Sequence, residues 1–231
     1  MFGKLIGNRT IRVLPLAATL AVATLIGLSG SAFAEEEAAT DAGVDLARGE
    51  KLFALCTQCH ASDGGGNFVA LAPAIAGMPA WYVEKQLQNF KSGMRGLHAG
   101  DTGGLRMYPM SLWLRNEADQ KAVAAYVSGL AATDPAHELA EHGDAAKGAD
   151  YYVVCAGCHG ASGEGIQLSS GPPLTGQSDW YLFESIKKYK SAVRGSGVGD
   201  PFGALMTVMA GTLPDDNAIL DVIAHIQSLE K

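Results

Sequence analysis

The chain has 231 residues, of which 48% are hydrophobic and 18% are charged, a composition typical of a globular protein. Its 24 acidic residues outnumber its 17 basic ones and leave a formal net charge of −7. Because binding to nucleic acid depends on basic residues that displace counterions from phosphates, this balance argues against a nucleic-acid partner. An acidic surface suits approach to basic patches on other proteins, although net charge also serves solubility alone.

The first 34 residues are typical of a secretory signal peptide. A basic segment (4–12) precedes an apolar run (13–28), and Ala-Phe-Ala at 32–34 fits the small-residue rule for cleavage. The apolar run has 16 residues, fewer than the roughly 20 that span a bilayer. We therefore expect cleavage and a periplasmic protein, with an uncleaved tether to the outer side of the inner membrane as the alternative. Residues 35–44, rich in Ala and Glu, are expected to form a disordered leader or linker.

Cys56-Thr57-Gln58-Cys59-His60 follows the pattern C-x-x-C-H, and Cys155-Ala156-Gly157-Cys158-His159 repeats that pattern 99 residues later. The pattern is typical of covalent haem attachment. Two thiols on one helical turn can bond the two vinyl groups of one porphyrin, and the histidine that follows can bind the iron. A redox dithiol would need a βαβ context, which is absent, and a zinc site would leave each copy short of ligands. We therefore predict two covalently bound haem c groups, with His60 and His159 as axial ligands.

The second half of the chain repeats the first at an offset of 99 without a gap. Trp81-Tyr82 aligns with Trp180-Tyr181, and Arg95-Gly96 aligns with Arg194-Gly195. Such self-similarity indicates two copies of one structural unit. We expect these units at 45–132 and 144–231, joined by a linker at 133–143. The linker histidines, His137 and His142, have no counterpart at the offset and are expected to be surface residues.

Each unit is expected to be helical, because no strand pattern rises above noise. In the first unit we expect helices over 45–55, 81–91 and 116–130, with a glycine-rich break at 93–104 and a loop around Met107. In the second unit the last helix opens at Pro214-Asp215-Asp216, followed by an apolar stripe at helical spacing. A unit of 88 residues builds a small core, so we expect that the haem completes it and that the chain does not fold stably without haem.

Two methionines recur behind each C-x-x-C-H motif: Met107 with Met206, and Met110 with Met209. Ligation of haem iron by histidine and methionine raises the reduction potential, whereas a lone methionine more often fills a gap in a core. Recurrence at the repeat offset favours ligation. Spacing alone does not separate the two members of each pair.

With these residues in place, the chain resembles a two-domain class I cytochrome c and is most similar to the cytochrome c4 family of dihaem periplasmic proteins. The resemblance covers nearly everything after residue 44. It rests on the C-x-x-C-H motifs, the Trp-Tyr helix openings, the M-x-x-M segments and the P-x-x-x-G segments at 73–77 and 172–176. It implies an all-α fold of two tandem domains, each wrapped round one haem. It also implies that Met107 and Met206 bind the irons, and that the carbonyls of Pro73 and Pro172 accept hydrogen bonds from the ligating histidines.

An iron held by protein ligands on both faces has no open position for a substrate. We therefore expect electron transfer between redox proteins of a respiratory chain, no catalysis, no small-molecule substrate, and two different reduction potentials. The main alternative is a cytochrome subunit of a larger, membrane-bound dehydrogenase or terminal oxidase complex. A peroxidase would need one haem to lack its methionine, and a non-haem metal protein would lack porphyrin altogether.

Overall fold

The computed structural model describes residues 43–135 and 137–230, all of which belong to one compact unit spanning residues 41–231. The expected signal peptide (1–34) and nearly all of the expected leader (35–44) lie outside the described residues. Within the described ranges, no helix is both long and apolar enough to cross a membrane.

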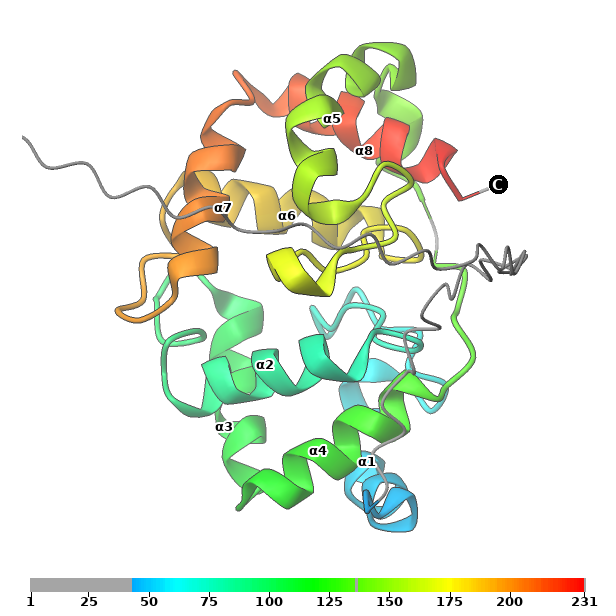
Figure 1. Ribbon diagram of the computed structural model, residues 1–231, viewed down its shortest axis with the longest axis vertical. Helices are drawn as coiled ribbons and strands as arrows, with labels where there is room; N and C mark the ends of the chain where they lie inside the picture. The colour runs from blue at the N-terminus through cyan, green and yellow to red at the C-terminus, as the bar shows by residue number, and fades with distance from the viewer. Residues whose placement is uncertain (1–42, 136, 231) are drawn as a thin grey trace, which may run out of the picture. The chain divides into compact units, whose positions relative to one another are not determined.

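Within the described residues, four α-helices in the first half are followed by four in the second half, in the same order (Figure 1). Over the described residues, pairing of extended backbone is limited to two isolated bridges, one in each half, so the prediction of an all-helical fold is confirmed. The helices are α1 (Leu46–His60), α2 (Ala80–Lys91), α3 (Thr102–Trp113), α4 (Glu117–Ser128), α5 (Ala145–His159), α6 (Asp179–Lys190), α7 (Pro201–Gly211) and α8 (Asp216–Ser228), with short 3-10 turns η1 (Ala140–His142) and η2 (Gln167–Ser169).

Each C-x-x-C-H motif forms the end of a helix rather than following one. The side chain of Asp45 accepts a hydrogen bond from the backbone nitrogen of Arg48 at 2.9 Å, and Asp144 caps α5 in the same way. Such caps satisfy backbone N–H groups that the first helical turn leaves free. Both helices then continue through the motif and end at its histidine. The two cysteines and the histidine of each copy are thereby held on one rigid element.

The first and last helices of each half cross with their backbones in close contact, α1 against α4 and α5 against α8 (Figure 1). Glycine at the crossing makes this possible. A Cβ atom added at Gly49 would lie 2.1 Å from the carbonyl oxygen of Ala122, and one added at Gly148 would lie 1.9 Å from that of Asp221. The recurrence of this glycine at the repeat offset therefore has a steric cause, since any larger residue would separate the two helices.

Replacing Gly148 by alanine is expected to destabilise the second half by about 1 to 3 kcal/mol, the usual cost of overpacking a tight contact. Gly211 is a matched control, because a Cβ atom there would meet nothing within 4 Å. Thermal unfolding of the haem-loaded protein, followed by far-ultraviolet circular dichroism, measures both variants. Equal unfolding temperatures for G148A and G211A would show that the helices can move apart at little cost.

The closing helix of each half supplies the centre of a hydrophobic core. In α8, the predicted apolar stripe is buried, with Ile219, Val222, Ile223 and Ile226 each 2% exposed or less. In α4, Val123 and Val127 are buried in the same way, whereas Leu130 lies just beyond the helix and is only partly buried. These helices therefore form the base on which the cysteine-bearing helices rest.

The prediction of a loop around Met107 is wrong. Met107 and Met110 lie within α3, and Met206 and Met209 lie within α7. The helices start where an aspartate caps them: the side chains of Asp101 and Asp200 accept hydrogen bonds from backbone nitrogens three residues on, at 3.1 and 3.0 Å. The glycines in this segment suggested an irregular chain. Gly104 instead lies in the first helical turn, where only glycine fits, because a Cβ atom there would lie 2.1 Å from the Asp101 carboxylate.

Candidate functional site

Two cavities lie in the described part of the chain, and each is bounded by one C-x-x-C-H motif and one pair of methionines. The first has a volume of about 450 Å³ and is lined by Cys56, Cys59 and His60 from α1 and by Met107 and Met110 from α3. The second has a volume of about 390 Å³ and is lined by the equivalent residues, Cys155, Cys158, His159, Met206 and Met209. The structure thus brings together the residues that the sequence singled out, one set in each half.

The two motif histidines are oriented by a backbone carbonyl. The Nδ1 atom of His60 lies 2.9 Å from the carbonyl oxygen of Pro73, and that of His159 lies 2.8 Å from the carbonyl oxygen of Pro172. When Nδ1 donates its proton to a carbonyl, the lone pair resides on Nε2, which is then available to a metal. Burial lowers the pKa of both histidines, although the hydrogen bond to the proline opposes this effect. Both rings are therefore suited to bind a metal as neutral imidazoles near neutral pH.

None of the four cysteines is paired in a disulfide. Burial raises the pKa of Cys56 and of Cys155 to about 11, so both thiols are protonated at neutral pH and are weak nucleophiles without activation. A redox dithiol would need a lowered pKa. The environment of Cys56 and Cys155 therefore argues against a reactive dithiol.

The methionines of each pair are three residues apart in a helix and therefore share one face. Both members of each pair line the cavity of their own half, and Met107 also contacts the buried cluster that contains Val123. The geometry allows either member to face the motif histidine. The choice of Met107 and Met206 as ligands stays a prediction.

The two cavities share part of their walls. Six residues line both of them, four from the first half and two from the second: Met78, Tyr82, Gln86, Arg95, Gln177 and Tyr181. Two contacts hold the halves together here. The side-chain amide of Gln177 donates to the carbonyl oxygen of Ala74 at 3.0 Å, and Arg95 donates to the hydroxyl of Tyr181 at 3.0 Å. Groups bound in the two cavities would therefore be separated by only a thin layer of side chains.

Two arginines at equivalent positions lie in or beside this shared wall: Arg95 lines both cavities, and Arg194 lines only the second. Arg95 stacks over Phe90 with its guanidinium carbon 4.4 Å from the ring centroid, and Arg194 stacks over Tyr189 at 4.5 Å. Each also donates to a side chain nine residues earlier, Gln86 at 2.7 Å for Arg95 and Ser185 at 3.0 Å for Arg194. The sequence contained a signal for the two arginines alone, because they recur at the offset of 99, whereas their partners differ in type between the halves.

These arginines fit the carboxylates of a porphyrin. Among the described residues, the buried Nε atom of Arg95 has no hydrogen-bond partner, and an unpaired buried donor on a charged group is costly. Burial favours the neutral form of Tyr181, but Arg95 and Arg194 outweigh burial and hold its pKa below the usual value. An excess of positive charge therefore faces both cavities. Propionate groups, with their paired oxygens, are suitable acceptors for guanidinium groups.

Sequence reasoning did not identify the tyrosines, Tyr82 and Tyr181, as part of the site. They were noted only as part of the repeat, and their position between two cavities depends on how the halves pack. Trp180 lines the first cavity, in the other half of the chain, and meets Phe68 edge to face at 5.4 Å. Residues from one half therefore complete the binding site of the other.

Each half thus combines a cysteine pair on a helix, a carbonyl-oriented histidine, a pair of thioethers in the same cavity and a positively charged rim. This combination defines a c-type cytochrome with two haem sites. The profile of the cytochrome c family matches residues 46–131 and again residues 145–230.

Two relatives extend the similarity over both halves. Cytochrome c4 of Pseudomonas aeruginosa is 30% identical over 217 residues, which cover 88% of this chain and 94% of the relative. The thiosulfate dehydrogenase electron acceptor of Thiomonas intermedia (strain K12) is 34% identical over 207 residues, which cover 84% of each protein. The chain therefore belongs to the cytochrome c family, among its dihaem members similar to cytochrome c4.

Solved structures show the same architecture. Reduced cytochrome c4 from Pseudomonas stutzeri matches with a TM-score of 0.64 and 26% identity, over 80% of this chain and 98% of that one. Thiosulfate dehydrogenase (TsdBA) from Marichromatium purpuratum matches with a TM-score of 0.61 and 29% identity, over 79% of this chain. The match spans only 40% of the Marichromatium chain, which is much longer. The protein is thus a dihaem electron carrier that binds two covalent haem c groups.

Proposed function

We propose that this electron carrier is a free periplasmic shuttle rather than an enzyme, built of cytochrome units at 45–132 and 144–231 behind a cleaved signal peptide. His60 and Met107 bind one iron, and His159 and Met206 bind the other. Bound haem supplies a one-electron couple between ferric and ferrous iron. The protein holds the irons, excludes other ligands from them and sets their potentials through burial and nearby charge.

The single observation that supports this proposal is that each cavity is lined by a motif histidine from one helix and by two methionines from another. An imidazole on one side and a thioether on the other leave no iron position for oxygen, peroxide or another substrate. The shared wall supports the same conclusion, because electrons can pass between groups bound in neighbouring cavities without leaving the protein.

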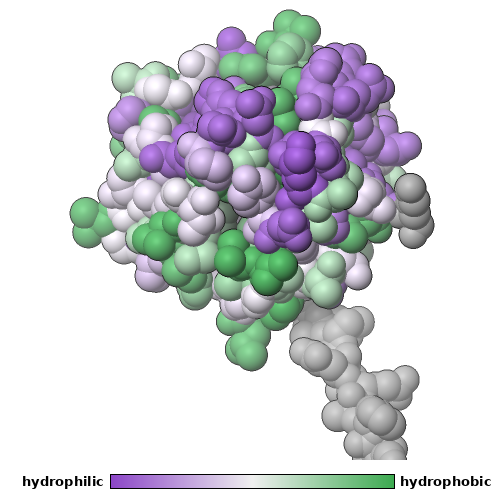
Figure 2. All heavy atoms as spheres, turned by 90° about the horizontal axis from the view of Figure 1, so that it is seen from above, coloured by the Kyte–Doolittle hydropathy of each residue, from purple (hydrophilic) through white to green (hydrophobic). Residues whose placement is uncertain are grey.

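The two units differ in net charge and therefore in the surface that each offers to a redox partner. The first unit, 45–132, has 8 basic and 7 acidic residues, whereas the second, 144–231, has 6 basic and 10 acidic residues. Exposed apolar side chains lie at the rim of both cavities, with Trp113 54% exposed in the first and Phe202 44% exposed in the second. Figure 2 shows one face on which hydrophilic side chains gather apart from smaller apolar areas. A basic redox partner is therefore expected to approach the second unit, since complementary charge speeds encounter.

Thiosulfate oxidation is the best-supported context for the donor. A relative of similar length is named as the electron acceptor of thiosulfate dehydrogenase, and the Marichromatium structure is a longer thiosulfate dehydrogenase chain that contains a matching part. We propose that a dehydrogenase of this class reduces the protein and that a terminal oxidase oxidises it. A permanent complex subunit is the alternative.

Exposure of the ferrous, haem-loaded protein to carbon monoxide tests the absence of an open iron position. The expected result is an unchanged Soret spectrum for both haems, because each sixth position is already held by a thioether. Turnover of hydrogen peroxide should likewise stay at the level of free haem. A carbon monoxide adduct on one haem, together with peroxidase turnover, would identify an enzyme instead of a carrier.

A further inference from the structure

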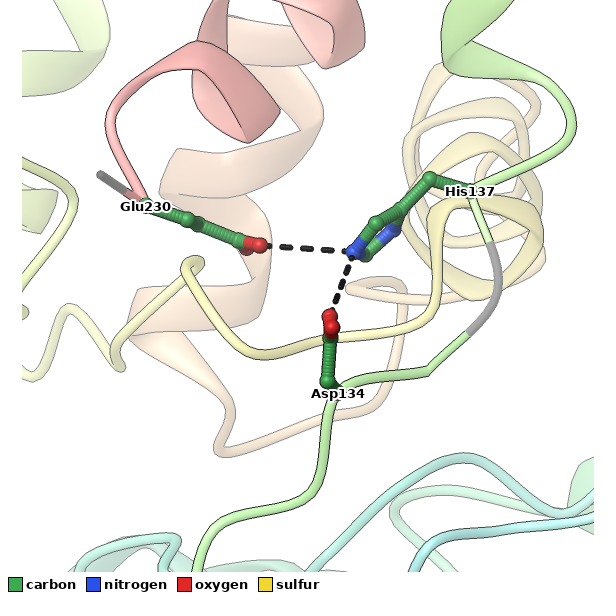
Figure 3. Close-up of side chains that lie close together, drawn as sticks. All are labelled: Asp134, His137 and Glu230. Atoms are coloured by element: carbon green, nitrogen blue, oxygen red, sulfur yellow. Dashed lines mark ion pairs between the residues drawn. The ribbon is translucent and has the colours of Figure 1, made fainter.

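One cluster of metal-ligating side chains lies away from both cavities. Asp134 and His137 belong to the linker between the two cytochrome units, and Glu230 lies beyond the end of α8, near the carboxyl end of the chain. Figure 3 shows the three side chains directed toward a common point. None of them lines either haem cavity. Electron transfer therefore gives no reason for their convergence.

His137 differs from the ordinary surface residue that its place in the linker suggested. Its side chain is only 25% exposed, and among the described residues neither ring nitrogen has a hydrogen-bond partner, although both are shielded from solvent. His142, the other linker histidine, is exposed as expected. A shielded imidazole nitrogen without a partner is costly, unless something absent from the polypeptide satisfies it.

The two distances from His137 are those expected around a small cation. The Nε2 atom of His137 lies 3.4 Å from an oxygen of Asp134 and 3.3 Å from an oxygen of Glu230, and the three ligand atoms all lie within 4.8 Å of one another. A hydrogen bond between such atoms would measure about 2.7 to 3.2 Å and would point along the N–H. Zinc binds these atoms at about 2.0 to 2.2 Å with tetrahedral geometry, which places neighbouring ligand atoms about 3.3 to 3.6 Å apart.

The charge of the cluster and the orientation of Glu230 also fit a divalent cation. The two carboxylates supply a charge of −2, which a divalent cation neutralises. The other oxygen of Glu230 accepts a hydrogen bond from the backbone nitrogen of Gly176 at 2.6 Å, and its side chain is only 19% exposed. Such a contact holds a ligating carboxylate in place. Asp134 is 94% exposed, so the cation can enter from its side.

We propose that Asp134, His137 and Glu230 form a zinc site, completed by water, that ties the linker to the carboxyl end of the second unit. The site fastens the segment between the two cytochrome units to the residues that follow α8. Loss of zinc would then release the linker without changing either haem. The proposal is independent of which proteins exchange electrons with this one.

Equilibrium dialysis of the haem-loaded protein against micromolar zinc chloride, followed by elemental analysis, tests the site. Iron serves as an internal standard, and we expect one zinc for every two irons. His137→Ala and Glu230→Gln should each weaken binding by about tenfold or more, since even indirect partners of a metal contribute that much. His142→Ala is the matched control and should bind zinc like the parent protein.

Two results would overturn the proposal. One is a parent protein that retains no more zinc per two irons than the H137A variant does. The other is zinc that survives both H137A and E230Q, which would indicate adventitious binding elsewhere on the acidic surface. Because the visible spectra of the haems report their ligation separately, an unchanged spectrum in H137A would show that loss of zinc is not a consequence of a misfolded cytochrome unit.

Discussion

Replacing Cys56 and Cys59 together by alanine is expected to unfold the first cytochrome unit. Without thioether bonds the haem is not retained, and a cavity of about 450 Å³ is left in a small helical unit. At roughly 24 cal/mol per Å³ of cavity, an empty site of this size costs on the order of 10 kcal/mol. The whole stability of a domain is only about 5 to 15 kcal/mol, so the helices would not stay packed. Far-ultraviolet circular dichroism should show the loss of roughly half of the helical signal.

The second unit provides the matched variant for this experiment. Replacing Cys155 and Cys158 by alanine leaves a cavity of about 390 Å³ and should unfold the second unit for the same reason. The intact mass of each double variant should fall by one haem relative to the parent protein, and that of the quadruple variant by two. Native helicity in a double variant that lacks one haem by mass would mean that the polypeptide core alone suffices.

Replacing Met107 by alanine is expected to lower the reduction potential of the first haem by on the order of 0.1 V or more. Axial ligands set haem potentials over a range of about 0.8 V, and a thioether favours the ferrous state. The ferric protein should also lose half of the weak absorption at the red end of the visible spectrum that methionine ligation produces. Potentiometric titration and ferric spectra measure both effects, and Met206→Ala should give the same result for the second haem.

Met110→Ala and Met209→Ala are the matched controls, because these methionines line the same cavities from the same helix faces. We expect each control to shift a potential by much less and to keep the full red absorption. If M110A rather than M107A removes the absorption, the second methionine of each M-x-x-M segment is the ligand. Retention of the absorption in all four variants would show that neither pair ligates iron.

The packing of the two halves explains why some features were predictable and others were not. The predicted stripe of α8 is found buried because amphipathic periodicity is local to one helix and needs no knowledge of its partner. The helix around Met107 was missed because Gly103, Gly104 and Pro109 are poor helix formers, and the cap at Asp101 was not weighed against them. In α3, the cap at Asp101 and the burial of the helix outweigh the low helix propensity of these residues.

Sequence by itself determined the repeat, the cysteine and histidine motifs, the helical class and the recurring methionines, because each depends on residue type and spacing within one copy. Only the tertiary structure decided that Tyr82, Tyr181, Arg95 and Arg194 lie in or beside the wall shared by the two cavities, and that His137 converges with Glu230. Those contacts join residues tens of positions apart, and no local spacing records them. Their energy comes from burial and charge pairing that exist only once the chain has packed.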